Sequence, residues 1–219
     1  VCELGFLEGL IPVLDVGFLS PAEMRRVSEV AALFKIMLDS VNESRFDQVY
    51  PESPGKKLEL RLKLLEWASK LKIPVVTGIM IGIGESKGHR KDMLNQIAQL
   101  HKDHGMVHEV VLQNFVPEAG TAFYRRSGPS KKVMLETVEK ALEILPSDVS
   151  VVVPMELNPD YEDFIRAGVR DLGRIQQGRG YITPQVDVTM DRLVDLAEKF
   201  DLRLQQRFPL RKSFIQQGK

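Results

Sequence analysis

Three things are scarce in this sequence: cysteine, an excess of charge of either sign, and long apolar runs. A single cysteine in 219 residues cannot form an internal disulfide, which indicates a reducing compartment. The 30 basic and 30 acidic side chains balance, so the chain has no bulk attraction for nucleic acid or anionic membranes. The longest apolar run, residues 73–84, is too short to cross a bilayer, and no signal peptide is visible. We therefore expect a cytoplasmic protein that binds neither nucleic acid nor membrane.

The apolar content is typical of one soluble domain with a substantial core, since 43% of residues are hydrophobic and 27% are charged. We expect this domain to cover residues 1–201, followed by a C-terminal tail at 202–219 whose half-apolar, basic pattern predicts no firm element. The chain starts in apolar sequence without a polar lead-in. We therefore expect it to be a piece of a longer protein.

One apolar, β-branched segment, residues 73–83, lies between helical patterns at 58–72 and 86–104. Such a run predicts a strand that is covered on both faces, as in a parallel α/β sheet. Three glycines fall near its end: Gly78, Gly82 and Gly84. Their missing side chains permit positive φ angles and the close approach of a flat ligand. Because ligands of parallel α/β sheets collect at the carboxyl ends of the strands, we expect the site between residues 77 and 85.

Strand candidates recur along the chain, with helical patterns between them. They centre near residues 10, 36, 78, 111, 151 and 170. This alternation predicts βα units, which build either an open doubly wound sheet or a (βα)₈ barrel. Steady alternation favours the barrel. We predict an α/β fold, an incomplete TIM-type barrel of about six parallel strands whose first two are missing. Ser20 and Ser86 are predicted helix N-caps, and Gly105 a helix end.

Polar residues at the ends of the predicted strands are candidates for ligand contacts. Gln113 and Asn114 follow an apolar strand, where two amides would be costly in a core but suit a heteroaromatic ring. Asp39 and Asp171 also end strands. Each could bind a ribose hydroxyl or an amino group, or be a loop carboxylate. Lys35, within a strand, lies either between helices or in the lumen of the barrel as a functional charge.

Several types of site are disfavoured by residue spacing. No acid or cysteine completes a metal site around His101, His104 and His108, so we predict surface histidines. A dinucleotide fingerprint would need glycine where Lys87 stands, which disfavours an NAD-dependent dehydrogenase. No catalytic triad or P-loop is present, so the sequence assigns no catalytic residue. Glu85 is either a ligand contact or a helix-capping acid in a tight turn.

The glycine strand also carries a family signature. From Gly78 to Glu85 the sequence is Gly-x-x-x-Gly-x-x-Glu, which resembles the fifth strand of radical S-adenosylmethionine (SAM) enzymes. More narrowly, the chain is similar to the radical SAM subunit of 7,8-didemethyl-8-hydroxy-5-deazariboflavin (FO) synthase. Supporting segments are 53–56, 100–101, 108–115 and 120–121, with weaker ones at 167–168, 183–184 and 207–209. The resemblance covers nearly the whole chain and is most specific between residues 53 and 121.

This resemblance implies a (βα)₈-type barrel, of which the chain would hold strands three to eight. The implied SAM contacts are Asp39, Thr77, Gly78, Met80, Gly82 and Glu85. The implied contacts to a small-molecule substrate are Gln113, Asn114 and Asp171. The family's reaction begins with a [4Fe–4S] cluster that cleaves SAM to a 5′-deoxyadenosyl radical. The radical drives cyclisation of a tyrosine-derived hydroxybenzyl–ribityl–uracil adduct, a lyase reaction of coenzyme F420 biosynthesis.

The sequence also departs from the family. The cluster needs three thiolates in a Cys-x₃-Cys-x₂-Cys loop, which Cys2 alone cannot supply. Other positions that differ from the usual family residue are Val13, Asp15, Ala31, Val152 and Arg174. Two hypotheses stay open. The chain is part of an FO synthase, completed by upstream residues or by a second FO synthase subunit or domain. Alternatively, it is an inactive barrel remnant or scaffold that binds a nucleoside-like ligand or a partner chain.

Overall fold

Five parallel strands form one sheet in the computed structural model of the protein, which describes residues 1–39, 43–121, 123–175 and 187–215. In chain order they are β1 (Val13–Leu14), β2 (Leu33–Lys35), β3 (Val75–Ile81), β4 (Val107–Asn114) and β5 (Ser150–Val152). Each strand pairs in parallel with the next. The sixth strand expected near residue 170 is present as a single parallel bridge between Val152 and Asp171.

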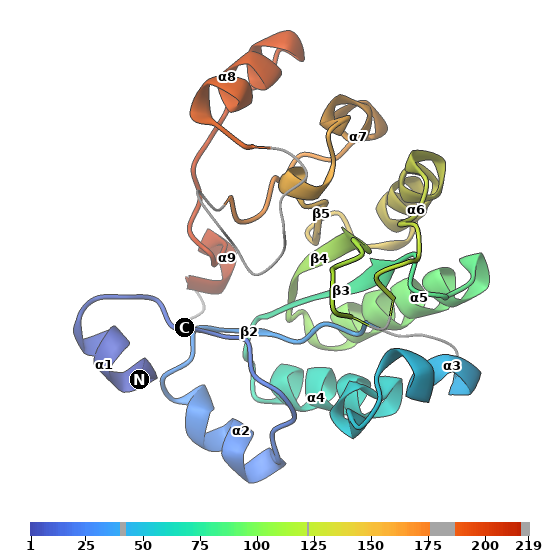
Figure 1. Cartoon of the computed structure of the whole chain (residues 1–219). Coiled ribbons are helices and arrows are strands. Elements are labelled where there is room, and N and C mark those ends of the chain that lie inside the picture. Colours follow the sequence, from blue (N-terminus) through green and yellow to red (C-terminus); the bar gives the residue numbers. More distant parts are fainter. Residues whose placement is uncertain (40–42, 122, 176–186, 216–219) are drawn as a thin grey trace.

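Helices connect the strands and form an arc along one side of the sheet (Figure 1). Those between strands are α2 (Pro21–Ser28), α3 (Glu43–Val49), α4 (Leu58–Lys70), α5 (Lys87–His104) and α6 (Lys131–Ile144). After β5 come α7 (Tyr161–Ala167), α8 (Met190–Lys199) and α9 (Lys212–Ile215), and α1 (Cys2–Leu7) precedes β1. Two 3₁₀ turns are η1 (Pro54–Lys56) and η2 (Met155–Leu157). The sequence did not predict α1, where glycines interrupt the apolar pattern.

Helix ends follow the local signals in the sequence. At the start of α2, Ser20 Oγ accepts a hydrogen bond from Glu23 N–H at 3.3 Å, and Glu23 Oε2 accepts from Ser20 N–H at 2.8 Å. Ser86 accepts from His89 N–H at 3.2 Å to cap α5. Gly105 ends the same helix with a φ of 70°. The predictions for these three helix ends are therefore confirmed.

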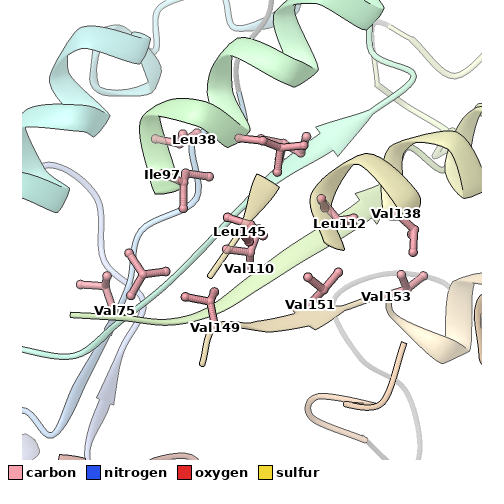
Figure 2. Packing of buried hydrophobic residues seen from close by; sticks show 14 of the residues in the cluster. Leu38, Val75, Ile97, Val110, Leu112, Val138, Leu145, Val149, Val151 and Val153 are labelled. Carbon is pink, nitrogen blue, oxygen red and sulfur yellow. The ribbon is translucent and has the colours of Figure 1, made fainter. Parts of the chain in front are cut away.

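The main core lies between the sheet and its helices (Figure 2). In β3 the buried residues Val75, Ile79 and Ile81 belong to this core, so Val76, Gly78 and Met80 face the opposite side, the lumen. The matching core residues are Val110 and Leu112 in β4, Val151 in β5 and Val153 just after it (Figure 2). Helices on one side and lumen contacts on the other explain why β3 is apolar along nearly its whole length.

Strand register arranges the lumen-facing residues in three rows. The charged row, nearest the amino ends of the strands, holds Lys35, Val76, Glu109 and Ser150. The middle row holds Gly78, Val111 and Val152, and the methyl group of Met37 lies beside Gly78. The upper row pairs Met80 with Gln113 at the carboxyl rim. The lumen therefore changes from charged to apolar to polar along the strands.

The C-terminal segment, residues 207–215, packs on the lumen side of the sheet, opposite the helical arc (Figure 1). Leu210 and Phe214 form a second apolar cluster with Leu33, Val76 and Met106, near the amino ends of the strands. The domain boundary after residue 201 stays a prediction, but this part of the expected tail contacts the barrel. None of the helices in the described part of the chain combines the length and apolar character needed to cross a membrane.

Gly78 allows β3 and β4 to approach closely. A Cβ atom at this position would lie 2.1 Å from Val111 O and 2.7 Å from the terminal methyl of Met37. We predict that Gly78→Ala lowers the free energy of unfolding by about 3 kcal/mol, because a strand backbone must shift. In Gly88→Ala, the control in α5, the added Cβ would meet only Ser86 Oγ at 3.6 Å, so stability should hold or rise slightly. Urea titration measures both, and equal stabilities would contradict this account.

Candidate functional site

Asp39 stands at the carboxyl rim, and only 6% of the residue is exposed. The preceding residue, Leu38, still donates its N–H to Gly78 O at 2.9 Å, so Asp39 begins where pairing to β3 ends. Its φ of 40° lies in the left-handed region. Asp39 Oδ2 accepts a hydrogen bond from Lys56 Nζ at 2.8 Å. This ion pair fastens η1 to the rim of the sheet.

Tyr50 and Arg61 lie beside this ion pair. Lys56 Nζ is 5.6 Å from the centroid of the Tyr50 ring, a cation–π contact. Burial raises the pKa of Tyr50 well above its ordinary value, and the negative charge of Asp39 adds to this rise. The positive charge of Arg61 opposes it, and Glu85 contributes a second negative charge. Charged residues from separate segments of the chain therefore surround the Tyr50 hydroxyl at the rim.

Arg61 is a buried cation near the start of α4, with 7% of the residue exposed. Its Nε has no hydrogen-bond partner, and its guanidinium forms no ion pair with any residue that the structure describes. A buried charge without a counter-charge is costly. Arg61 is therefore available to bind an anionic group at the rim.

Glu85 holds the glycine-rich turn together. Its carboxylate accepts hydrogen bonds from Gly82 N–H at 2.9 and 3.0 Å and from Ile83 N–H at 3.0 Å. Gly84 N–H adds a bond at 3.2 Å, and Arg90 Nη1 donates to Oε1 at 2.8 Å. Positive φ angles of 97° at Gly82 and 124° at Gly84 let successive N–H groups converge on the carboxylate. The side chain thus caps its own turn, and a contact to SAM stays a prediction.

The loop after β4 packs against this turn. A Cβ at Gly82 would lie 2.7 Å from Pro129 Cδ, and Arg126 Nη1 donates to Ile83 O at 3.2 Å. The expectation that the missing side chains leave room for a ligand is therefore wrong on the Cβ side of Gly78 and Gly82. Protein atoms fill both places, because β4 and its following loop approach β3 closely.

The expected SAM residues within β3 lie on two faces of the sheet. Thr77 is fully buried on the helix side, and its Oγ1 has no hydrogen-bond partner among the described residues. Gly78 and Met80 lie on the lumen side, where Met80 is half-buried in the upper row. Only Met80 can therefore offer a side chain to a ligand in the lumen, and the SAM contacts themselves stay predictions.

The two expected amides of the substrate site are also separated. Gln113 is half-buried and faces the lumen next to its register partner Met80. Asn114, on the other face, donates to Leu157 O at 3.1 Å and accepts from Asn158 Nδ2 at 3.0 Å. Asn114 therefore ties β4 to the turn that follows β5. Substrate contacts by either amide stay predictions.

The charges deeper in the lumen are paired within the protein. Lys35 follows the core residue Phe34 in β2 and is in register with Val76, so it lies on the lumen side of the sheet, where its Nζ is 3.0 Å from Asp15 Oδ2. Asp171 accepts hydrogen bonds from Ser150 Oγ at 2.6 Å and from Arg207 Nη2 at 2.8 Å. Burial alone would raise the pKa of Asp171, but these hydrogen bonds hold it below its ordinary value. Its carboxylate is therefore ionised, and its contact with substrate stays a prediction.

The prediction of surface histidines is wrong at two positions. His101 is 7% exposed, and its Nε2 lies 3.1 Å from Asp148 Oδ2. His108 is fully buried, with its ring centroid 5.7 Å from that of Phe214. Burial and two nearby guanidinium groups lower the pKa of His108 to about 4. The reason is tertiary, because the C-terminal segment covers His108.

The described residues contain no cluster of three or more His, Cys, Asp or Glu side chains suited to a metal ion. Cys2, the single cysteine of the sequence, lies in α1. A [4Fe–4S] cluster is held by several thiolates, so the residues of this chain do not fit one.

Curated FO synthases are similar to this chain over nearly its whole length. The sequence is 37% identical over 220 residues to the 7,8-didemethyl-8-hydroxy-5-deazariboflavin synthase of Methanococcoides burtonii. It is 36% identical over 214 residues to that of Archaeoglobus fulgidus. The chain is a homologue of FO synthase. The matches cover 100% and 97% of the chain but only 65% and 64% of these two FO synthases.

Solved structures share the fold of this FO synthase homologue at low sequence identity. Methylornithine synthase (PylB) matches 99% of the chain and 64% of its own, with a TM-score of 0.70 and 14% identity. The FeFe-hydrogenase maturase HydG from Carboxydothermus hydrogenoformans matches 91% of the chain and 52% of its own, with a TM-score of 0.68 and 14% identity. These matches confirm the predicted fold, an incomplete α/β barrel of parallel strands. No family model matches the chain.

The sequence analysis missed Arg61, although a signal was present. The buried residues of α4 include Arg61, Leu64, Leu65 and Ala68, which follow the i, i+3, i+4, i+7 stripe of a core-facing helix. A charge inside such a stripe indicates either a buried ion pair or a ligand contact. Only the structure shows that no described residue pairs with it.

The capping role of Glu85 gives a stability prediction. Glu85→Gln should lower the free energy of unfolding by about 2 kcal/mol, because an amide loses the charged bond from Arg90 and part of its acceptor capacity. Glu59→Gln on α4 is the control, since this exposed carboxylate pairs only with Lys63 and should matter little. Urea titration compares the two, and a loss no larger than that of the control would refute the capping role.

Proposed function

We propose that the chain is the SAM- and substrate-binding part of an FO synthase. The whole enzyme would form 7,8-didemethyl-8-hydroxy-5-deazariboflavin, on the way to coenzyme F420, from a tyrosine-derived hydroxybenzyl–ribityl–uracil adduct. Identity of 37% to an FO synthase along the whole chain supports this activity. The observation that carries the position of the SAM site is Arg61, a buried rim guanidinium with no anionic partner among the described residues.

The functional groups of SAM match the charges of the rim. Its carboxylate would pair with Arg61, whose planar guanidinium can bind both oxygens. Asp39 would accept from the ammonium group or a ribose hydroxyl. A carboxylate has about four acceptor positions, and Lys56 occupies one of those of Asp39. The rim therefore has one group for each charged end of the methionyl part of SAM.

The glycine turn would bind the adenine through its backbone. Protein atoms already occupy the Cβ side of Gly78 and Gly82, and Glu85 already accepts bonds from the turn. Met80 would contribute an apolar side-chain contact from the upper row, and Thr77, on the other face, would act through its backbone alone.

The substrate would lie in the lumen between the upper row and the charged row. Gln113 can donate to and accept from the edge of a uracil ring. Asn114 would act indirectly, by holding the turn after β5 in place. Asp171 would meet the substrate from the deeper end of the lumen.

A cluster-binding part outside this chain is required by this proposal. In radical SAM enzymes the [4Fe–4S] cluster supplies the electron that cleaves SAM, and this chain has too few cysteines to hold it. We infer that the cluster is held elsewhere in the same enzyme, in the same polypeptide or in a second FO synthase subunit. β1 is an edge strand, and α1 exposes Leu4, Phe6 and Leu7, so this side of the barrel offers a surface for that part.

The second candidate is an inactive barrel remnant that binds a nucleoside-like ligand or a partner chain. The single cysteine supports this candidate, because an active FO synthase needs three cysteine thiolates to hold its [4Fe–4S] cluster. Co-expression with the cysteine-containing part of the Methanococcoides burtonii FO synthase separates the two candidates. Deazaflavin fluorescence after supply of the adduct supports the enzyme, and its absence in a complex that holds a cluster supports the remnant.

Calorimetric titration of the chain with SAM tests the rim site. We predict measurable binding that Arg61→Met weakens by about tenfold or more, because a charge-assisted hydrogen bond to the carboxylate is lost. Asp39→Ala should weaken binding as well, because it removes the proposed acceptor for the ammonium group or a ribose hydroxyl. Arg61→Met should fold, since it removes an unpaired buried charge and keeps an apolar stem.

Lys63→Met is the control for this titration. It removes a cation from the same helix at an exposed position, where Lys63 pairs with Glu59, and it should leave SAM affinity unchanged. Equal SAM affinity in Arg61→Met and the unmodified chain would refute the rim site.

A further inference from the structure

The C-terminal segment places Arg207 between two carboxylates of the lumen. Arg207 Nη2 donates to Glu109 Oε2 at 2.6 Å and to Asp171 Oδ1 at 2.8 Å. Arg207 Nε donates to the same Asp171 oxygen at 3.1 Å. These partners lie 98 and 36 residues away in the sequence, so the fold alone brings them together.

Arg211 brings a second cation to the same place. Its guanidinium donates to Asp148 O and to Ser150 Oγ, and Ser150 Oγ in turn donates to Asp171 Oδ2 at 2.6 Å. Phe214, one turn further on, is buried against the amino ends of the strands and anchors the segment. The two arginines and the two carboxylates together carry no net charge.

The charge balance depends on Arg207. Burial raises the pKa of Glu109 above its ordinary value, and the bond from Arg207 opposes this rise. Two neighbouring carboxylates that lose their shared cation cannot both stay ionised in a buried site. Without Arg207 the pKa of Glu109 would therefore rise further, and the pair would take up a proton at a higher pH than in the unmodified chain.

Other titratable groups near the pair are already neutral or paired. His108 has a pKa of about 4, so it is uncharged above pH ~5. Burial raises the pKa of Tyr161 well above its ordinary value, so this phenol stays protonated. In the charged row, Lys35 has Asp15 as its own partner. Arg207 is one cause of the low pKa of His108, so replacing Arg207 raises this pKa as well. Recovery of stability on adding Glu109→Gln is therefore what assigns a pH-dependent loss to the two carboxylates.

Asp171 keeps room for one more donor. Its Oδ1 accepts from Arg207 and from Gly173 N–H at 2.9 Å, whereas among the described residues Oδ2 accepts only from Ser150. A carboxylate oxygen has two lone pairs, so Oδ2 can accept a further hydrogen bond. An alcohol is a donor of suitable chemistry, because it brings no second charge into a balanced site.

We propose that Arg207 is a positioning residue that keeps Glu109 and Asp171 ionised at the floor of the lumen, the end near the amino ends of the strands. There Asp171 accepts a hydrogen bond from a hydroxyl of the substrate's ribityl chain. This role rests on the proposed function, because the substrate lies in the lumen above the floor. The C-terminal segment would then form part of the substrate site in the lumen.

Thermal unfolding at two pH values tests the charge part without any ligand. Arg207→Gln should lower the Tm by about 5 °C relative to the unmodified chain at pH ~8, and by much less at pH ~5.5. A carboxyl whose pKa is raised in the folded state destabilises the protein when it is ionised, and this destabilisation falls as the pH drops through that pKa. The loss of Tm is therefore larger at the higher pH. Adding Glu109→Gln to Arg207→Gln should restore much of the loss at pH ~8.

The control is Arg203→Gln, the same change four residues before Arg207 at an exposed position with no ion pair to a described residue, which should leave the Tm unchanged at both pH values. Arg207→Lys, which keeps the charge, should remove the pH dependence of the loss. An equal fall in Tm at both pH values, with no recovery on adding Glu109→Gln, would overturn the proposal and leave Arg207 a packing role only.

Binding of two ligands tests the hydroxyl part. Fluorescence titration should show that Arg207→Gln binds the hydroxybenzyl–ribityl–uracil adduct about tenfold more weakly at pH ~8. An analogue with an alkyl chain in place of the ribityl group should bind both proteins equally. Equal weakening for both ligands would overturn the hydroxyl contact. Failure of the unmodified chain to bind either ligand would instead overturn the proposed function, and the unfolding experiment would still decide the charge balance.

Discussion

The pairing of β3 with β4 is the constraint on which the site depends. Residues 75–81 are in register with 107–114, and the close approach at Gly78 makes this possible without a side chain between the strands. This ladder sets which residues face the lumen and at what depth. It places Met80 beside Gln113 at the rim and Val76 beside Glu109 at the floor. A change of one residue in register would exchange the two faces, and the lumen would lose its polar rim.

Charged side chains are paired differently at the two ends of the lumen. At the floor, near the amino ends of the strands, Arg207 pairs with Glu109 and Asp171, whereas Arg211 donates to a backbone carbonyl and to Ser150 Oγ. At the rim, Asp39 is paired with Lys56, whereas Arg61 has no counter-charge among the described residues. Because an unpaired buried charge is costly, the proposed anionic ligand site is at the rim. The floor is already neutral and would supply hydrogen bonds rather than charge.

Local signals predicted much of the fold. The capping box at Ser20, the cap at Ser86 and the C-terminal glycine at Gly105 marked helix ends correctly, because each satisfies backbone groups within its own turn. The strands around Val76 and Val110 were clear from apolar periodicity. The predicted strand near residue 170 shrank to one bridge, and α1 was missed, because short segments depend on their tertiary neighbours more than on their own pattern.

The sequence by itself determined that a buried parallel strand ends in a glycine-rich turn before a helix, because strand patterning and the Gly-x-x-x-Gly-x-x-Glu pattern are local. Tertiary structure alone decided what those residues contact. It turned Glu85 inward onto the turn, buried His108 under Phe214, left Arg61 without an anionic partner among the described residues and brought Arg207 to Glu109. The reason is physical: the partners of a buried charge are set by which strands and segments meet in space, and separations of up to 98 residues leave no local trace in the sequence.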